Sequence, residues 1–232
     1  MSDRRHLLAR LTAAVVQGSK REQLADRLCA AYRDVASTTG AAVTMWYGEP
    51  HRITLAATDS TAARLEDLQE VIGEGPGHSA WQSGRIESVV VPDRRAATRW
   101  PAFTDAAAAQ VEFAVLHAVP IRPWDETLGV VTTYQLPHPP PDLLIGDDER
   151  QFLANAVGAA LIRDTRAVED QQVGAWSSPA RIHQAAGMVV ARLHVSPEDA
   201  LALLRAHAYA DDVTLSHIAD SVLARRLDFP VA

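Results

Sequence analysis

The chain has 232 residues, of which 47% are hydrophobic and 22% are charged. This composition is typical of globular proteins, and the length suits two modest domains. The formal net charge of -7 argues against a protein held on nucleic acid by bulk charge, because that mode of binding needs many Lys and Arg contacts to phosphates. Any nucleic-acid target would therefore be recognised by a local group of residues.

No apolar run approaches the roughly 20 residues of a membrane span, and no signal-peptide core follows the charged residues 1–10. We therefore expect a cytoplasmic protein without a membrane segment. Cys29 is the only cysteine, which excludes an intramolecular disulfide and a cysteine-rich zinc site. Its place in a helical pattern with Leu24, Leu28 and Tyr32 predicts a small buried thiol.

The N-terminal part of the chain has the apolar spacing of helices. One cluster spans Leu7 to Leu11 and a second spans Leu24 to Tyr32, with Gly18-Ser19 between them. This pattern predicts two helices or one broken helix. Residues 42–47 and 53–57 are short, rich in β-forming residues and separated by a Gly-Glu-Pro-His turn, which predicts a hairpin.

The middle of the chain alternates between helices and strands. A helix is expected to begin at Asp59, and a short helix over His78 to Gln82 is expected to lead into a strand at 86–91. Between them, the glycine-rich loop at 73–77 lacks the Lys-Ser/Thr ending of a phosphate-binding loop, so we interpret it as a structural turn beside a pocket. An alanine-rich helix follows Trp100-Pro101.

Two long apolar runs, at 113–121 and 128–136, form the clearest hairpin in the chain. The proline tract at 137–141 ends the second strand, because proline has no amide hydrogen for a ladder. A long helix from about Asp147 to Val168 follows, with apolar residues on one face. The order of these elements predicts an α+β fold with a mostly antiparallel sheet and helices on its faces.

Several short motifs in this region occur in the order typical of one family. They are Leu68-Gln69, the loop Gly73-Glu74-Gly75-Pro76-Gly77, Ala80 and Gly84, Trp100-Pro101 with Phe103, Val119-Pro120 and Gly129-Val130. With these motifs, residues 20–168 resemble GAF domains, which are small-molecule sensor and dimerisation modules. The resemblance implies a sensory half, with a small-molecule ligand as a partner, but it does not identify that ligand.

Three short helical patterns make up the C-terminal tail. Ser178-Pro179 has the chemistry of a helix start, and Ser196-Pro197 repeats it with Asp199 placed to complete a cap. A third helix is expected to start at Thr214. Apolar residues at helical spacing predict the buried faces of the three helices: Ile182, Ala185, Ala186, Val189 and Leu193; Ala200, Leu203, Leu204 and Ala208; Leu215, Ile218, Val222 and Leu223. Such a unit suits recognition rather than catalysis.

Gly187 lies inside the first of these helices, where glycine costs about 1 kcal/mol relative to alanine. Something is therefore expected to approach the backbone closely. Two candidates remain open: another helix, packed through Ala200 or Ala219, and a ligand such as a nucleic-acid base stacked on the small residues there. Polar side chains that could bond the edges of a base border this surface: His183, Gln184, Arg192 and Arg205.

The tail shares a set of residues with a second family. They are Ile182, Gln184, Ala185, Gly187, the helix start Ser196 to Ala200, Leu204-Arg205, Leu215, Ile218-Ala219 and Val222. With them, residues 179–228 resemble the ANTAR domain, the RNA-binding module of transcription antiterminators. ANTAR proteins bind paired stem-loops in nascent leader RNA as dimers, so that a terminator hairpin cannot form. The resemblance implies RNA contacts at Gln184, Ala185, Gly187, Met188, Arg192, Arg205, Ser216 and Arg225.

Two features depart from the ANTAR pattern. Ala186 stands where the family commonly has a lysine, and residues 172–232 contain five arginines and six acidic residues, a formal charge of -1. RNA-binding domains normally show a basic patch. Either Arg192, Arg205 and Arg225 cluster on one face, or RNA affinity is weak, or the module serves another use. The alternative function is therefore a ligand sensor whose tail binds a protein rather than RNA.

The predicted organisation is a GAF-like sensor domain at 1–168, a connecting segment at 169–178 and an all-α, three-helix ANTAR domain at 179–232. We expect a dimeric transcription regulator that is not an enzyme, because no Ser/His/Asp or paired-carboxylate arrangement can be placed at one site. The tail's histidines lack i, i+4 pairs, so neither a metal nor a cofactor is expected. A signal at the sensor is expected to change the pairing of connecting helices over about 147–176.

Overall fold

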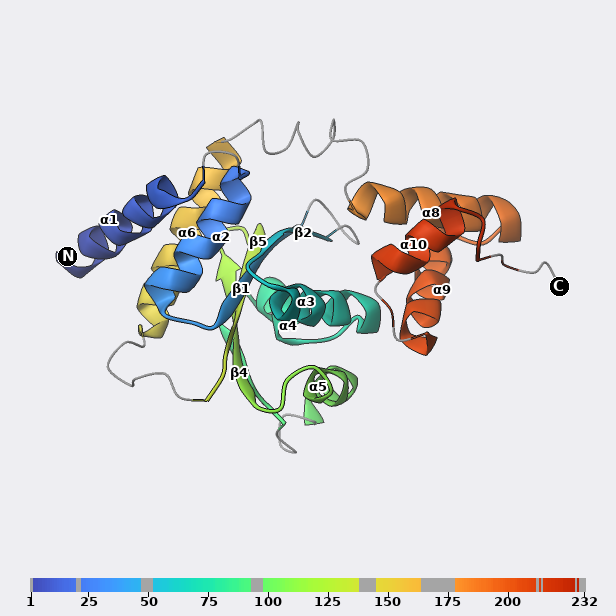
Figure 1. The fold of residues 1–232 in the computed structure, drawn as a ribbon, viewed down its shortest axis with the longest axis horizontal. Coiled ribbons are helices and arrows are strands. Elements are labelled where there is room, and N and C mark those ends of the chain that lie inside the picture. The colour runs from blue at the N-terminus through green and yellow to red at the C-terminus, as the bar shows by residue number, and fades with distance from the viewer. Residues whose placement is uncertain are drawn as a thin grey trace. The chain divides into compact units, whose positions relative to one another are not determined.

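Figure 1 shows the computed structural model, which describes residues 2–19, 22–46, 52–92, 98–137, 145–163, 178–211, 213, 215–227 and 229. The chain folds into two compact units. The first unit comprises residues 1–69 and 74–167, and the second comprises residues 70–73 and 168–232.

A sheet of antiparallel strands forms the centre of the first unit (Figure 1). The strands within the described ranges are β1 (Gly40–Trp46), β2 (Arg52–Ala57), β3 (Glu87–Val91), β4 (Ala114–Ile121) and β5 (Gly129–Gln135). Their order across the sheet is β2-β1-β5-β4-β3, and every neighbouring pair is antiparallel. Both predicted hairpins, β1 with β2 and β4 with β5, are confirmed.

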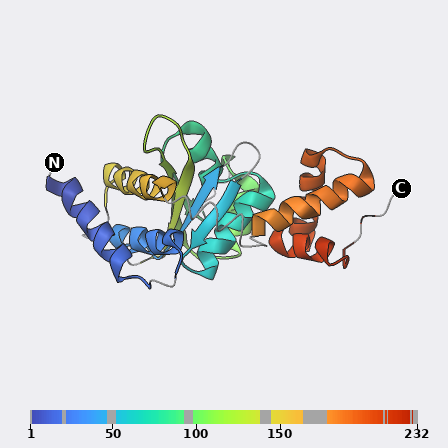
Figure 2. The same cartoon turned by 90° about the horizontal axis from the view of Figure 1, so that it is seen from above.

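Helices lie on both sides of this sheet, as the view from above also shows (Figure 2). Their bounds are α1 (Ser2–Gln17), α2 (Leu24–Ala36), α3 (Ser60–Ile72), α4 (Pro76–Ser83), α5 (Pro101–Ala108) and α6 (Asp147–Arg163). Helices α2 and α6 cover one face with α1 packed against both, and α3 and α4 lie on the other side. The predicted α+β fold, with helices on both faces of an antiparallel sheet, is confirmed.

The strand sequences show why both faces need helices. Successive side chains of a strand point to opposite faces of the sheet. Val119 and Val131 therefore enter the core beside α2 and α6, whereas their neighbours Ala118 and Val130 pack with Ala80 of α4. Because both faces are covered, β4 and β5 are buried at most positions, as expected of strands without a solvent face.

The N-terminal helices, the start of α3 and the burial of Cys29 agree with the local predictions for the first unit. The N-terminal region forms two separate helices, since α1 ends at Gln17 and α2 begins at Leu24. Asp59 caps α3, because its Oδ1 accepts a hydrogen bond from the backbone N–H of Ala62 at 2.9 Å. The Cys29 thiol is buried, as predicted, and burial raises its pKa to about 12. Helix α6 is described to Arg163, and its expected extension to residue 168 or beyond lies outside the described residues.

The glycine-rich loop after α3 is held by buried polar side chains. The backbone N–H of Gly77 donates to Oε1 of Gln69 at 2.6 Å, and a Cβ added at Gly75 would lie 2.5 Å from the same oxygen. Gln69 in turn donates from Nε2 to Glu66 at 2.8 Å, and Glu66 forms an ion pair of 3.0 Å with Arg52. The glycines therefore make room for the Gln69 side chain, which supports the interpretation of the loop as a structural turn.

The second unit contains helices α8 (Ser178–Leu193), α9 (Pro197–Ala210) and α10 (Leu215–Leu223). Their shared core contains the predicted apolar faces, including Ala185, Val189, Leu204, Leu215, Ile218 and Val222. At the start of α9, the Ser196 hydroxyl accepts from the backbone N–H of Asp199 at 3.0 Å and donates to the Asp199 carboxylate at 2.8 Å. The predicted cap is thus confirmed, whereas Thr214 lies outside the described residues.

Of the helices that the structure describes, none is long and apolar enough to cross a membrane. Among all the residues that the structure describes, no three His, Cys, Asp or Glu side chains lie close enough together to hold a metal ion.

Candidate nucleic-acid interface

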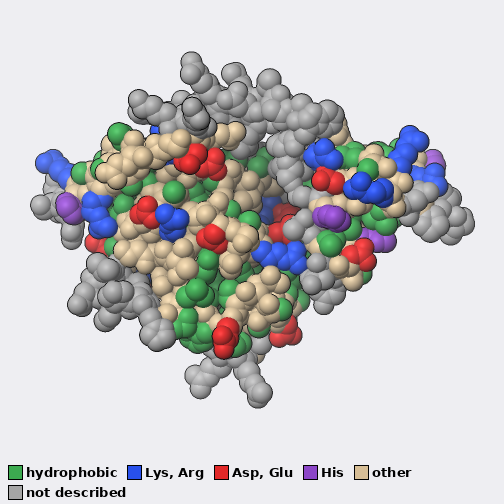
Figure 3. Space-filling view, in the orientation of Figure 1, with side chains coloured by type: hydrophobic (Ala, Val, Ile, Leu, Met, Phe, Trp, Pro, Cys, Tyr) green, Lys and Arg blue, Asp and Glu red, His purple; other side chains and the backbone are tan. Residues whose placement is uncertain are grey.

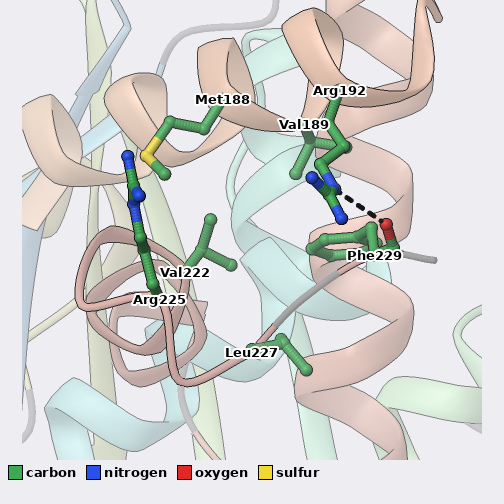
Figure 4. Close-up of a pocket in the computed structure, with 7 residues that line it drawn as sticks. All are labelled: Met188, Val189, Arg192, Val222, Arg225, Leu227 and Phe229. Carbon is green, nitrogen blue, oxygen red and sulfur yellow. Dashed lines mark hydrogen bonds between the residues drawn. The ribbon is translucent and has the colours of Figure 1, made fainter. Parts of the chain in front are cut away.

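A pocket of about 310 Å³ opens in the second unit, between α8 and the segment that follows α10 (Figure 4). Three elements line it: Met188, Val189 and Arg192 from α8, Val222 from α10, and Arg225, Leu227 and Phe229 from the following segment. The described lining therefore combines apolar walls and two guanidinium groups, and it contains no acidic side chain.

Helix α8 supplies one side of the pocket through its periodicity. Met188 and Arg192 are four residues apart, so they lie on the same face of the helix in successive turns. Val189, which follows Met188, is turned towards the helical core and is only 1% exposed. Met188 by contrast is 36% exposed, and Arg192 is exposed as well. The same face of α8 thus carries an apolar and a cationic side chain at the mouth of the pocket.

The end of α10 fixes the position of Arg225. The N–H of Arg225 donates to the carbonyl of Val222 at 2.9 Å, and the N–H of Arg226 donates to the carbonyl of Ser221 at 2.8 Å. These are the two bonds of a Schellman motif, whose left-handed residue is usually glycine. Here that residue is Arg225, with φ of 55°, a conformation that costs a side-chain-bearing residue roughly 1–2 kcal/mol. Strain of this kind concentrates at functional sites.

The segment after α10 is tied to the other helices by Phe229. Its carbonyl oxygen accepts a hydrogen bond from Nε of Arg192 at 3.2 Å, the bond drawn in Figure 4. Its ring is buried and meets the His207 ring of α9 edge to face, with ring centroids 5.0 Å apart. Arg192 lies beside Phe229, and Arg225 lies beside Met188 (Figure 4). The two guanidinium groups therefore reach the pocket from different walls.

None of the acidic side chains that the structure describes lines the pocket. Asp220 of α10 instead forms an ion pair with Arg181 of α8. Basic side chains are visible over the helices of this unit in the space-filling view (Figure 3). Although the formal charge of residues 172–232 is -1, the described lining of the pocket carries two arginines.

Three of the predicted RNA-binding residues come together in this pocket: Met188, Arg192 and Arg225. Gln184 is exposed on α8, four residues before Met188 and thus on the same face. Arg205 lies on α9 and is not among the lining residues. Ser216 belongs to α10, but its side chain lies outside the described residues. One of the three alternatives placed Arg192, Arg205 and Arg225 on a single face, and the structure brings Arg192 and Arg225 together at the pocket.

Two expectations about α8 need correction. Ala185 is fully buried, so its side chain belongs to the core and cannot contact RNA. A Cβ added at Gly187 would meet no atom within 4 Å, so the packing of Ala200 or Ala219 against this glycine, one of the two alternatives, is wrong. Ala186, which stands at the family's lysine position, is 7% exposed and packs in the core.

Leu227 and Phe229 were missed by sequence reasoning, which ended at the third helix. The signal was present, because an aromatic residue follows Arg225-Arg226 closely. What the sequence could not show is that a left-handed turn at Arg225 returns the chain to α8.

The family model of the ANTAR domain matches residues 171–223. This part of the chain is an ANTAR domain. The match covers α8, α9 and α10 and stops before Arg225, Leu227 and Phe229. One wall of the pocket therefore lies beyond the matched region.

Two solved structures are similar to the chain. One is a GAF domain from A. aeolicus in an inactive state, with 14% identity and a TM-score of 0.48, covering 69% of this chain and 97% of that one. The other is the GAF domain of a protein described as a sensor histidine kinase from Pseudomonas syringae pv. tomato, with 18% identity and a TM-score of 0.39, covering 72% and 92%. A search of the curated proteins finds no match.

The first unit has the antiparallel sheet and flanking helices expected of a GAF-like domain, and the ANTAR match lies on its C-terminal side.

Proposed function

We propose that this protein is a signal-responsive transcription regulator. Its ANTAR domain binds stem-loops in nascent RNA and prevents termination, and its GAF-like domain senses a small molecule and controls that binding. The observation that supports this proposal most strongly is the pocket, which brings Met188, Arg192 and Arg225 together on an ANTAR domain. The protein acts by binding rather than by catalysis, in the cytoplasm, where nascent transcripts are made.

RNA binding depends on a few side chains at the pocket rather than on the net charge of the chain. Arg guanidinium groups recognise phosphates through paired, charge-assisted hydrogen bonds. Arg192 and Arg225 can supply such contacts although the whole chain is acidic, because salt screens exposed charges beyond about 10 Å. RNA loops also offer unstacked bases, which proteins hold on apolar, aromatic and guanidinium surfaces.

Antitermination follows from competition between RNA structures. A protein that holds one stem-loop stabilises it against the terminator hairpin that would use the same nucleotides. A homodimer engages two hairpins of one leader, and the second contact then benefits from a high effective concentration. Ligand binding to the GAF-like domain controls the process by shifting the population of dimers that can engage both hairpins.

The first experiment measures filter binding of the full-length protein to leader RNAs with tandem hairpins. Gly187→Glu places a negative charge on an exposed face of α8, where an added Cβ meets no atom within 4 Å, so we expect the fold to be preserved. Gly187→Gln is the matched control with nearly the same bulk. We expect the glutamate variant to lose much more affinity than the glutamine variant, and we expect binding by the wild-type protein to weaken as salt increases.

Equal and salt-insensitive binding by all three proteins, or binding by none, contradicts the RNA proposal. In the second case the alternative function, a tail that binds a protein partner, becomes the better account. Antitermination itself is tested by transcription through a leader and its terminator, where the wild-type protein increases read-through and Gly187→Glu does not.

A further inference from the structure

We infer that the pocket between α8 and the segment after α10 holds one unpaired nucleotide of an RNA loop. The base lies against Met188, Val222 and Leu227, and Arg225 contacts the phosphate. This inference rests on the proposed RNA-binding function and specifies what the pocket contributes to it.

The size and lining of the pocket argue for a single nucleotide. A volume of about 310 Å³ is at the low end of the roughly 300–1,000 Å³ typical of small-molecule sites. A pocket of this size excludes a duplex. Its walls consist of a thioether, aliphatic side chains and a phenyl ring, with arginines at two sides. A nucleotide has the matching parts, namely a flat apolar face and an anionic phosphate.

The structure of RNA hairpins also favours a single unpaired nucleotide as the ligand. Side chains cannot reach the base edges in the deep major groove of an A-form helix, so proteins read RNA sequence mostly in loops and bulges, where bases are splayed out. A stem-loop therefore presents its phosphates along the stem and its free bases in the loop. The pocket suits a free base, because it is concave and combines apolar side chains with two guanidinium groups.

The backbone at Arg225 provides an independent argument. Glycine would occupy the left-handed position of the Schellman motif without strain, but this chain has an arginine there. The strained turn places the guanidinium beside Met188 at the mouth of the pocket (Figure 4). Arg225, Leu227 and Phe229, which form this wall, lie beyond the residues that the ANTAR model matches.

The test is an abasic scan of the hairpin loop. Hairpin RNAs share one stem, and each loop nucleotide in turn is replaced by an abasic residue that keeps the phosphate. Fluorescence anisotropy then measures binding to the full-length protein. We expect one loop position to lose about tenfold in affinity, the effect of one stacked base, and the other positions to change little.

Pocket-filling variants connect that position to the pocket. Met188→Trp fills the mouth from α8 without adding charge, and Val16→Trp, which adds the same side chain at an exposed position of the first unit, is the control. We expect Met188→Trp to bind the intact RNA as weakly as the wild-type protein binds the critical abasic RNA, and to lose discrimination between the two RNAs. Val16→Trp is expected to keep both the affinity and the discrimination. If Met188→Trp fails to fold, as circular dichroism would show, Leu227→Trp fills the pocket from the opposite wall.

The outcomes separate the two claims. If the wild-type protein binds no hairpin RNA, the proposed function fails and this inference fails with it. If it binds hairpins but the abasic scan shows no critical position, or if both tryptophan variants bind and discriminate like the wild-type protein, the proposed function stands and the pocket inference is overturned.

Discussion

Two arginine sites of this protein have different surroundings. In the first unit, the Arg52 side chain is 6% exposed and forms an ion pair with Glu66, whose side chain is 2% exposed. In the second unit, Arg192 and Arg225 are exposed at a pocket whose described lining contains no acidic side chain. The comparison shows that burial beside a carboxylate, rather than residue type, distinguishes an arginine that holds a fold from one that is placed to bind a ligand.

Left-handed backbone turns occur in both units, with different residues. In the first unit, Gly75 and Gly84 adopt positive φ, where glycine carries no steric cost, and Ser37 does so at the end of α2. Among the described residues from 178 onward, those with positive φ are His194 and Arg225, neither of which is a glycine. Of these positions, Arg225 is the one that lines the pocket, so the strain there lies beside a candidate site.

The largest expected effect concerns the buried ion pair. Glu66→Ala leaves Arg52 buried without its partner, and breaking a buried pair costs about 3–5 kcal/mol. We expect a fall of this size in the free energy of unfolding of the first unit, measured by urea denaturation. Glu112→Ala removes the same charge from an exposed position and is expected to change the stability by less than about 0.5 kcal/mol. Equal stability of both variants would break the contrast between the units.

Removing arginine charge from the pocket of the second unit is expected to change RNA affinity rather than stability. Replacing Arg192 and Arg225 together by glutamine should lower RNA affinity about tenfold or more and reduce the slope of log K against log salt by about 0.7 for each lost phosphate contact. Replacing Arg5 and Arg85 together by glutamine removes two exposed charges from the first unit and serves as the control. An unchanged slope in the variant without Arg192 and Arg225 would show that these arginines do not meet phosphates.

Arg225→Gly separates stability from function at one residue. Glycine relieves the left-handed strain, so we expect the free energy of unfolding to rise by about 1 kcal/mol. The same substitution removes the guanidinium, so RNA affinity should fall. Thermal unfolding checks the rise in stability, and fluorescence anisotropy on the same sample checks the fall in RNA affinity. A variant that is less stable, or one that binds RNA as tightly as the wild-type protein, would contradict the role of this residue.

The smallest effect is expected at Gly187. Because a Cβ there meets no atom, Gly187→Ala should stabilise α8 by up to about 1 kcal/mol, the difference in helix propensity. If RNA approaches this part of the backbone, the added methyl group also lowers affinity slightly. A gain in stability with unchanged affinity would confine RNA contact to the pocket and Gln184. A loss of stability would contradict the open surroundings of this glycine.

Much of the fold could be predicted from local patterns. Alternating apolar residues and turn signals gave both hairpins, and the Ser196 cap was visible from the spacing to Asp199. The prediction of an RNA contact at Ala185 shows where the family resemblance and the helical periodicity disagree. Helical spacing places it with Ile182 and Val189 on the core face, so its assignment to the RNA surface conflicted with the periodicity and is wrong.

The pocket could be predicted only in part. The family resemblance indicated Met188, Arg192 and Arg225 singly, but their meeting depends on tertiary packing. A left-handed turn is usually recognised from a glycine, and Arg225 gives no such signal. The contact of Arg192 with the Phe229 carbonyl joins residues 37 positions apart through the backbone, so no side-chain pattern reveals it.

Photo-crosslinking tests the central claim most directly. A leader hairpin with 4-thiouridine in its loop is irradiated with the full-length protein, and the crosslinked peptides are identified by mass spectrometry. The account predicts crosslinks to peptides that contain Met188 or Leu227, which disappear when unlabelled hairpin competes. Crosslinks confined to residues of the first unit, or crosslinks to the second unit that an unlabelled hairpin does not displace, would contradict recognition of RNA by this ANTAR domain.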